Sequence, residues 1–330
     1  MINNKLLKQI FPKSQIHKDK IIYQDWEVPI ANDILRFSPD ISYSTGNFSK
    51  LRDKFAELQF DSKNKTTDRL NTILQRTNWD KNYFKDKLIL ECGCGAGPDT
   101  EILLSLGAKV VAVDIAGLDV AKNNLRNFDN LLLIQADLSN LPFEKEIFDI
   151  VWCHRVLQHT PNPRGILRKI LTLSKSDGAV FVHSYAKTLP QLLSWKYFLR
   201  PITKNMNDKN LYKLVESLTP ALFYFTCFLR KIPPKILGKI LFKLSEFIIP
   251  IRNYRYIDKF QNKSDQFIIE YAIHDTFDAL SPKYDSPTSS RNIKRIALEC
   301  GLNNFEVITM GKFSPTPVTL LRTIDVNEKN

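Results

Sequence analysis

Cysteine, methionine and tryptophan are scarce in this chain of 330 residues, which contains five, three and four of them. The five cysteines, Cys92, Cys94, Cys153, Cys227 and Cys300, are scattered and odd in number. They give no disulfide framework, so we expect a reducing compartment. Cys92 and Cys94 flank one glycine but have no second pair of ligands, and we predict no metal site.

The chain also lacks long uninterrupted apolar runs. Residues 1–20 are basic and mixed in character and contain no apolar stretch of signal-peptide length. Residues 217–229 carry no charge, but this segment is shorter than the ~20 residues that a membrane-spanning helix needs. We therefore expect a cytoplasmic protein without a transmembrane helix.

Acidic residues are fewer than basic ones, 35 against 47, which gives a formal net charge of +12. Most of the excess lies in residues 187–263, where 15 Lys and Arg face 4 Asp and Glu, a surplus of 11. Such a local surplus indicates an anionic partner for this segment rather than a general property of the surface.

Residues 88–97 read Leu-Ile-Leu-Glu-Cys-Gly-Cys-Gly-Ala-Gly. The apolar run predicts a strand buried on both faces, and the alternate glycines predict a loop that brings backbone N–H groups close to a ligand. A helix is expected from Asp99. The nearest alternative is an enzyme that binds NAD through the dinucleotide fingerprint G-x-G-x-x-G. Counted from Gly93, the last glycine of this fingerprint would fall on Pro98, which argues against that alternative.

Acidic residues follow the next two predicted strands. The strand at 109–113 ends at Asp114, 21 residues beyond Gly93, where a carboxylate can accept hydrogen bonds from ribose hydroxyls. The strand at 131–134 leads to Asp137, and further strands are predicted at 148–152 and 179–183. Each acid alone could be a solvated strand end, but together they are expected at the same edge of the sheet as the glycine loop.

The pattern E-x-G-x-G-x-G at residues 91–97, with Asp114 and Asp137, resembles the first motifs of class I S-adenosylmethionine (SAM) methyltransferases. This resemblance implies SAM as the cofactor, with its methionine part over the glycines, ribose on Asp114, an apolar wall at Ile115 and adenine near Asp137. The residues expected to bind it are Glu91, Gly93, Gly95, Gly97, Asp114, Ile115, Asp137, Leu138 and His154.

Two further segments resemble parts of bacterial methyltransferases. Residues 153–163 leave the carboxyl end of a central strand, where open sheets bind ligands, and they contain His154 and His159 as candidate bases. Residues 274–285 follow a D-T-F-D-x-x-S-P-K-Y pattern that we interpret as a substrate-facing loop, which adds His274 and Asp275 to the catalytic candidates. Core packing and helix capping are the alternative roles for these side chains.

Residues 26–37 resemble the end of a zinc-ribbon-like module of the Trm112 type, although no cysteine precedes Cys92 and the metal site is therefore expected to be lost. Helices are predicted at 49–61 and 67–77. Phe60, Tyr43 and Phe48 are candidates for a lid over the cofactor, with core packing as the alternative.

A basic amphipathic helix is predicted from Lys235, where lysines recur at 239 and 243. The opposite stripe consists of Leu237, Ile240, Leu241, Leu244 and Ile248. Such a helix fits an anionic membrane surface, which would make the protein peripheral at the membrane. A helix covering the core and a homodimer that buries the stripe are the alternatives.

Together these features predict an α/β fold with a Rossmann-like, seven-stranded methyltransferase sheet, a last strand that is antiparallel, an N-terminal helical cap and a helical insertion after strand five. The expected divisions are residues 1–85, 86–186, 187–286 and 287–330. The expected function is SAM-dependent methyl transfer to a small-molecule, lipid-linked or glycan acceptor. An RNA methyltransferase and a non-catalytic SAM-binding protein are the alternatives, and DNA is not an expected partner.

Overall fold

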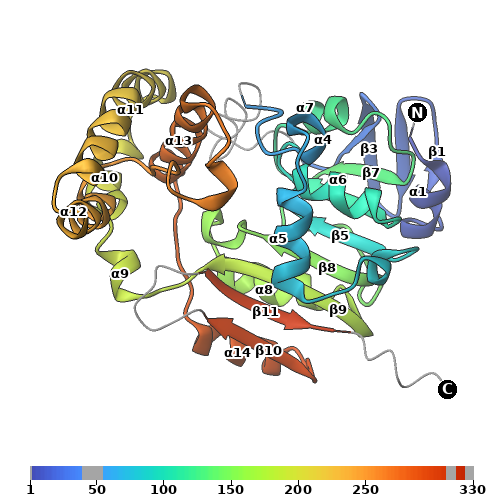
Figure 1. Ribbon diagram of the computed structural model, residues 1–330. Coiled ribbons are helices and arrows are strands. Elements are labelled where there is room, and N and C mark those ends of the chain that lie inside the picture. Colours follow the sequence, from blue (N-terminus) through green and yellow to red (C-terminus); the bar gives the residue numbers. More distant parts are fainter. Residues whose placement is uncertain (1, 39–54, 310–316, 324–330) are drawn as a thin grey trace.

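A single eleven-stranded sheet runs through the protein in the computed structural model, which describes residues 2–38, 55–309 and 317–323 (Figure 1). Seven strands, the number that the sequence predicts for the methyltransferase sheet, lie side by side in the order β7-β6-β5-β8-β9-β11-β10. Their bounds are β5 (Leu88–Cys92), β6 (Lys109–Asp114), β7 (Leu131–Gln135), β8 (Phe148–His154), β9 (Ser174–Tyr185), β10 (Phe305–Thr309) and β11 (Pro317–Arg322).

Strands β5 to β9 are parallel, whereas β11 runs antiparallel to both β9 and β10. In the register, Leu320 lies opposite Val182 of β9 and Val307 of β10. The predicted Rossmann-like α/β fold with an antiparallel last strand is therefore confirmed.

The two faces of the sheet are covered by different helices. Leu88 and Leu90 of β5 pack with α1 (Asn4–Ile10), α8 (Pro163–Leu171) and α14 (Ser290–Glu299). Ile89, which points the other way, packs with α5 (Asp68–Thr77), α6 (Pro98–Ser105) and α7 (Leu118–Asn124). Because both faces are buried, β5 reads as a continuous apolar run rather than an alternating one.

The N-terminal region is only partly the helical cap that the sequence predicts. Helix α5 confirms the helix predicted at 67–77. The helix predicted at 49–61 is wrong at residues 55–59, which form turns before α4 (Asp61–Asn64), and residues 2–38 form α1 and four strands. These are β1 (Gln15–Ile16), β2 (Lys20–Tyr23), β3 (Trp26–Ala31) and β4 (Ile34–Arg36), and β4 continues the sheet in parallel with β7. Alternate burial of Ile21, Tyr23 and Val28 against α1 explains the strands. The kinship with a zinc ribbon stays a prediction, and Tyr43 and Phe48 lie outside the described residues.

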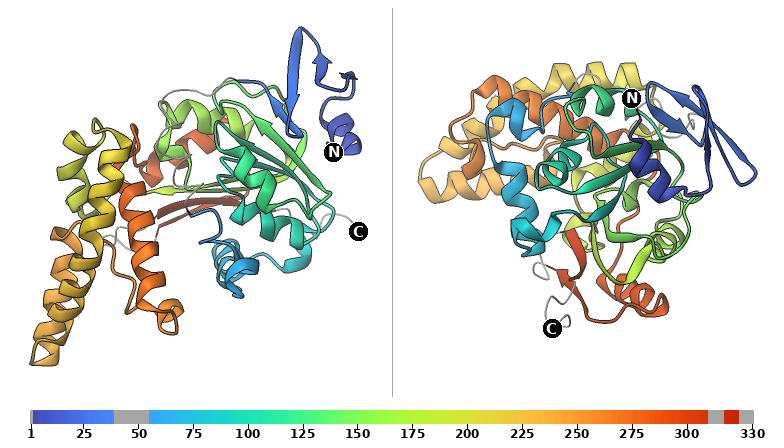
Figure 2. Two further views of the ribbon diagram at one scale, coloured as in Figure 1. Left: turned by 90° about the horizontal axis from the view of Figure 1, so that it is seen from above. Right: turned by 90° about the vertical axis from the view of Figure 1, so that its right-hand side faces the viewer.

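The helical insertion after β9 consists of α9 (Leu189–Leu192), α10 (Trp195–Thr203), α11 (Asp208–Lys231), α12 (Lys235–Ile248) and α13 (Asp265–Leu280). It has a hydrophobic core of its own, which includes Trp195, Phe223 and Phe277. Figures 1 and 2 show this insertion on the opposite side of the molecule from β1 to β3.

The first half of the expected substrate loop is helical. His274 and Asp275 belong to α13, which begins after Ser264, whose hydroxyl accepts the N–H of Phe267 at 3.2 Å. Apolar residues at helical spacing, including Ile269 and Ile273, are buried along it. This periodicity outweighs the loop character of the charged residues between them.

No helix within the described part of the chain combines the length and the apolar character that crossing a bilayer requires.

Candidate active site

A cavity of about 430 Å³ lies at the carboxyl ends of the parallel strands, between the sheet and the insertion. One end is lined by the segments that follow β5, β6 and β7, and the other by residues of the insertion, above all of α13. Its volume is within the ~300–1,000 Å³ that small-molecule sites occupy. Open α/β sheets bind their ligands at this position.

The glycine turn after β5 forms one wall. Gly93, Gly95 and Gly97 have φ values of +77°, +61° and +96°, in the left-handed region that other residues rarely adopt. A Cβ atom on Gly93 would also collide with Val156. Gly93 and Gly95 line the cavity, whereas Gly97 lies behind them as the N-cap of α6.

Asp114 ends β6 and ties the glycine turn to the next loop. One of its carboxylate oxygens accepts the N–H of Gly95 at 2.8 Å, and the other accepts those of Ile115 at 2.8 Å and Ala116 at 3.3 Å. The carboxylate thus fixes both loops, and its contact with a ribose stays a prediction. Asp137 and Leu138 line the cavity after β7, and their contact with adenine stays a prediction as well.

Glu91 does not reach the cavity. Its side chain is buried beneath the glycine turn, where Thr100 Oγ1 donates to Glu91 Oε2 at 2.6 Å. Burial and the neighbouring charge of Asp99 raise the pKa of Glu91 to about 8. Glu91 therefore supports the turn from below, and a direct contact with the cofactor does not follow from its position.

His154 is held by a network around Asp99. Its Nδ1 lies 2.6 Å from Asp99 Oδ2, which also accepts Trp152 Nε1–H at 2.9 Å, while Arg69 pairs with Oδ1. Arg76 donates to His154 Nε2. Burial lowers the pKa of His154 to about 4, which keeps the ring neutral. With both ring nitrogens engaged, His154 is poorly placed to act as a base.

The other two histidines face the cavity from different elements. His159, in the turn after β8, has Nδ1 3.3 Å from the carbonyl oxygen of Tyr284. His274 Nδ1 lies 3.0 Å from Asp275 Oδ1, and Tyr254 donates its hydroxyl to Asp275 Oδ2. The structure thus brings His159, His274 and Asp275 together around one cavity.

Comparison with known proteins identifies the core of the chain. Residues 90–182 match the family described as "Methyltransferase domain". Residues 90–182 therefore form a methyltransferase domain. This match supports the predicted family and, with it, SAM as the methyl donor.

The relatives of this methyltransferase domain are distant. A ubiquinone biosynthesis O-methyltransferase of Glaesserella parasuis is 29% identical over 38% of this chain and 59% of its own. One from Colwellia psychrerythraea is 31% identical over 34% and 48%. The chain thus spans about half the length of these relatives. A solved phosphoethanolamine N-methyltransferase 2 from Haemonchus contortus, in complex with SAM, is 24% identical over 35% and 27%, with a TM-score of 0.32.

Several cationic and phenolic side chains around the cavity of the methyltransferase domain were not predicted from the sequence. Arg155 could have been recognised, since it stands beside His154 in the turn after β8, where ligands bind. Lys196, Arg252 and Tyr254 come from the insertion, where no motif or periodicity marks them. Lys196 is buried and pairs with Asp285 at 2.6 Å, at the end of the segment predicted to face the substrate.

Proposed function

We propose that this protein transfers the methyl group of SAM to a small-molecule acceptor bound in the 430 Å³ cavity. The observation that carries the proposal is the composition of this cavity. The glycine turn, Asp114 and His159 line it from the ends of the strands, and His274 and Asp275 line it from α13. A methyl donor and a nucleophile bound in this cavity would be neighbours.

The transfer we propose is an in-line displacement at the sulfonium methyl group. An acceptor oxygen, nitrogen or carbon forms the new bond to carbon, the carbon–sulfur bond breaks, and S-adenosylhomocysteine leaves as a neutral thioether. Little acid assistance is needed, so positioning of the two reactants at near-attack distance supplies most of the acceleration. The proton lost by the acceptor passes to a base in the cavity.

His274 and His159 are our candidates for that base. Asp275 accepts a hydrogen bond from His274 Nδ1, which fixes the ring and leaves the lone pair of the neutral form on Nε2. Burial lowers the pKa of His274, but the hydrogen bond and charge of Asp275 outweigh it and raise the pKa. If His274 is the base, its Gln variant loses turnover and the parent enzyme becomes more active as the pH rises through this pKa.

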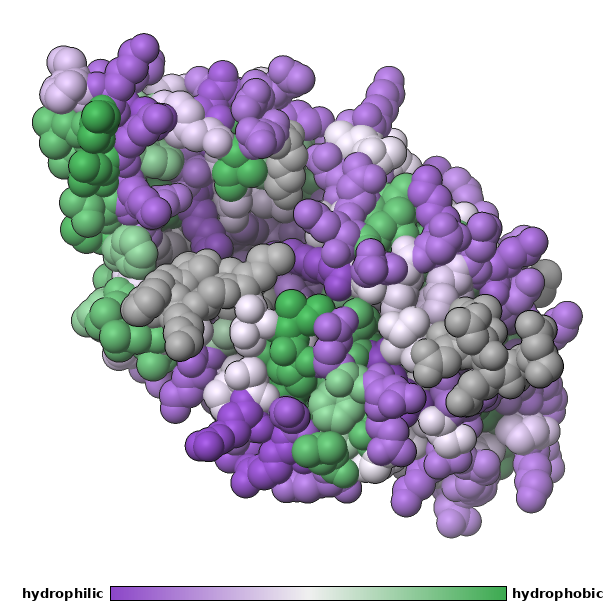
Figure 3. Space-filling model, turned by 60° about the horizontal axis from the view of Figure 1, so that its bottom comes forward, coloured by the Kyte–Doolittle hydropathy of each residue, from purple (hydrophilic) through white to green (hydrophobic). Residues whose placement is uncertain are grey.

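For the acceptor we propose a lipophilic or lipid-linked molecule, such as a quinone, a lipid or a lipid-linked sugar. Of the 20 large hydrophobic side chains with exposed surfaces in the described chain, 18 belong to residues 187–263. Figure 3 shows hydrophobic residues at the left, where the insertion lies, as well as near the centre of this face. An anionic membrane surface that contacts this insertion would account for both its apolar and its basic residues.

Two other functions make different predictions. An RNA methyltransferase would use the insertion to bind phosphates, and its affinity for RNA would fall steeply with salt. A non-catalytic SAM-binding protein would bind the donor and release no methylated product. The exposed apolar residues favour the lipophilic acceptor over RNA, because an RNA interface is polar and positively charged.

Calorimetry with SAM tests the donor site. We expect Asp114→Ala to weaken binding by about tenfold or more, because three backbone N–H groups and the ribose lose their acceptor. Gly95→Asp should also weaken it, by strain at a φ of +61° and by its charge. The exposed Asp129→Ala is the control. Unchanged affinity for SAM in both site variants would refute the donor site.

A separate experiment identifies the acceptor: the protein is incubated with labelled SAM and with lipid, small-molecule or RNA extracts.

A further inference from the structure

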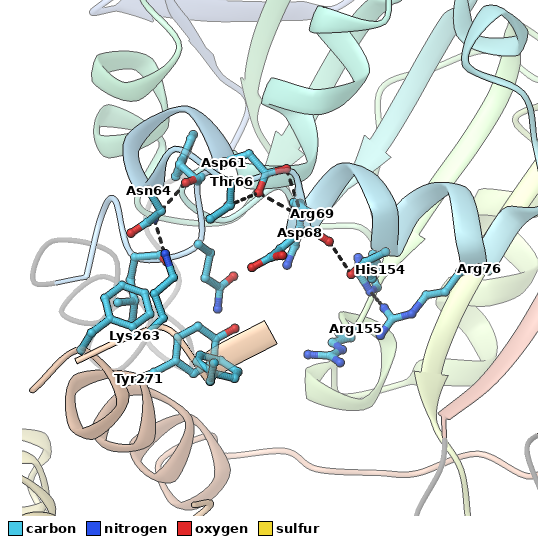
Figure 4. Close-up of a pocket in the computed structure, with 16 residues that line it drawn as sticks. Asp61, Asn64, Thr66, Asp68, Arg69, Arg76, His154, Arg155, Lys263 and Tyr271 are labelled. Atoms are coloured by element: carbon cyan, nitrogen blue, oxygen red, sulfur yellow. Dashed lines mark hydrogen bonds between the residues drawn. The ribbon is translucent and has the colours of Figure 1, made fainter. Parts of the chain in front are cut away.

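A second, smaller cavity of about 100 Å³ lies beside the 430 Å³ cavity, between α5 and α13 (Figure 4). The two cavities are adjacent, because six residues line both of them. These shared residues are Gln59, Phe60, Arg69, His154, Arg155 and Tyr271. A molecule in the larger cavity would therefore lie next to the side chains of the smaller one.

Positive charge prevails in the smaller cavity. Its lining contains four cationic side chains, Arg69, Arg76, Arg155 and Lys263, against the carboxylates of Asp61 and Asp68. Arg69 is paired with Asp99. The carboxylate of Asp61 accepts hydrogen bonds from the hydroxyl of Thr66 and from backbone N–H groups at the start of α5.

Arg76 and Arg155 have no carboxylate within ion-pair distance in the described part of the protein. The guanidinium of Arg76 donates to His154 Nε2, but that ring is neutral and does not balance its charge. Burial and the charges of Arg155 and Arg69 lower the pKa of Arg76 to about 10. This crowding of guanidinium groups is unfavourable, and an anion bound among them would relieve it.

Arg155 is fixed at the junction of the two cavities by its backbone. Its φ is +61°, which is uncommon for a residue other than glycine, and its N–H donates to the carbonyl of His183 at 2.7 Å. Figure 4 shows its side chain extending into the space between α5 and α13. The exposed guanidinium can therefore contact a ligand in either cavity.

We infer that the methyl acceptor carries an oxyanion, either a carboxylate or a phosphate, and that Arg76 and Arg155 bind it in the smaller cavity. This inference rests on the methyl transfer proposed above and specifies the chemical class of the acceptor. The planar fork of a guanidinium matches the paired oxygens of both groups, and such charge-assisted hydrogen bonds are strong. The oxyanion would hold the acceptor so that its nucleophile faces the methyl donor.

The test uses calorimetry on the whole chain, saturated with S-adenosylhomocysteine, at constant ionic strength. The probes are phenyl phosphate, benzoate and the neutral benzyl alcohol. We expect both anions to bind at least about tenfold more tightly than benzyl alcohol, and Arg155→Gln to remove about tenfold of their affinity. Arg155→Lys should restore part of this loss, and the exposed Arg126→Gln should change nothing.

Equal binding of all three probes, or full anion affinity in Arg155→Gln, would overturn the inference. Arg155 is exposed, so this variant should fold even if Arg76→Gln does not. The affinity for S-adenosylhomocysteine, measured in the same titrations, separates the two proposals. If the parent protein does not bind S-adenosylhomocysteine, the donor site is refuted. If it binds S-adenosylhomocysteine but shows no preference for the anionic probes, only the oxyanion site is refuted. Tighter binding of dihexanoyl phosphatidate than of phenyl phosphate would indicate a lipid headgroup, and the reverse a soluble acceptor.

Discussion

Asp99, which no sequence motif singles out, joins side chains of α5 and β8. Its carboxylate accepts hydrogen bonds from Trp152 and His154 and pairs with Arg69. Burial opposes its charge, but Arg69 and His154 hold the pKa of Asp99 well below its usual range. Removing this carboxylate would leave a buried guanidinium and two N–H donors without their acceptor, which is among the more costly changes in a protein interior.

The stability of the protein should fall in mild acid because of His154. Burial keeps this ring neutral, with a pKa of about 4, whereas in the unfolded chain it titrates near the ordinary value of 6.5. Below pH 6.5 the unfolded chain takes up a proton that the folded chain does not. The free energy of unfolding should therefore drop as the pH falls from 6.5 to 4, by about 3 kcal/mol in total for this residue.

Denaturant unfolding of the parent and of His154→Gln at several pH values measures this effect. The variant should lose less stability over the same range, while the exposed His17→Gln should behave like the parent. Parallel curves for the parent and His154→Gln would contradict the prediction. His183, which is also buried, is present in all three proteins, and burial, the main cause of its lowered pKa, acts in each of them.

Which site residues can be predicted depends on how local their signal is. Gly93, Gly95 and Asp114 belong to a strand and turn pattern that is contiguous in sequence, so their shared position follows from the parallel sheet alone. The partners of Asp99 lie 30 residues before it and 53 and 55 residues after it, and only the packing of α5 against the sheet joins them. Arg252 and Tyr254 depend similarly on where the insertion docks.

At the scale of elements, α12 packs against its neighbours through small residues. Gly238 and Ser245 are its buried positions, and a Cβ on Gly238 would lie 2.6 Å from the carbonyl oxygen of Arg230. The predicted apolar stripe is instead largely exposed, with Ile240 at 51% and Ile248 at 74%. A helix that merely covers the core would bury such a stripe, so this arrangement favours the membrane hypothesis.

Replacing Lys235, Lys239 and Lys243 of α12 by Glu should abolish binding to anionic vesicles. Each basic residue near an acidic lipid surface contributes ~1 kcal/mol, and the substitution reverses three charges. Co-sedimentation measures this: the parent should bind phosphatidylserine-containing vesicles, but not neutral ones, and less so as salt is added.

The matched control is a triple Glu variant of Arg291, Lys294 and Arg295, which makes the same charge change on α14. It should bind like the parent. If the α12 variant is recovered on anionic vesicles as efficiently as the parent, the membrane hypothesis fails and the methyltransferase domain is unaffected.

The elements that the sequence misassigned have weak or conflicting local signals. Strands β1 to β4 are two to six residues long, and β3 contains Pro29, so they gave no pattern comparable to that of β5. Residues 274–280 combine acidic residues with apolar residues at helical spacing, and they form the end of helix α13 rather than a loop. The buried strands were predicted well because their apolar runs are uninterrupted, and the amphipathic α12 was predicted well because its helical spacing is.

On the scale of the whole molecule, the cavity lies between two parts that have separate hydrophobic cores. The sheet with its covering helices forms one part, and helices α10, α11 and α13 of the insertion contribute the other core. Each part supplies residues to the lining. A ligand that contacts both should therefore stabilise the insertion as well as the glycine turn.

Hydrogen exchange with and without S-adenosylhomocysteine tests this coupling. We expect slower exchange at residues 93–97 and also at 271–279 when the ligand is bound, because it restricts opening of both walls. Peptides from α14, which covers the far side of the sheet, should not change. Protection confined to residues 93–97 would show that the insertion does not close on the donor, and Asp114→Ala should lose protection at both places.

The N-terminal strands also protect the sheet from other chains. Without β4, the backbone N–H and C=O groups of one side of β7 would be unpaired, and the strand is apolar and mostly buried. Such a hydrophobic edge invites edge-to-edge aggregation, whereas the actual edge on this side is β1, only two residues long. A catalytic fragment cut at the expected boundary after residue 85 would expose that edge and should precipitate, even though every residue of the glycine turn remained in it.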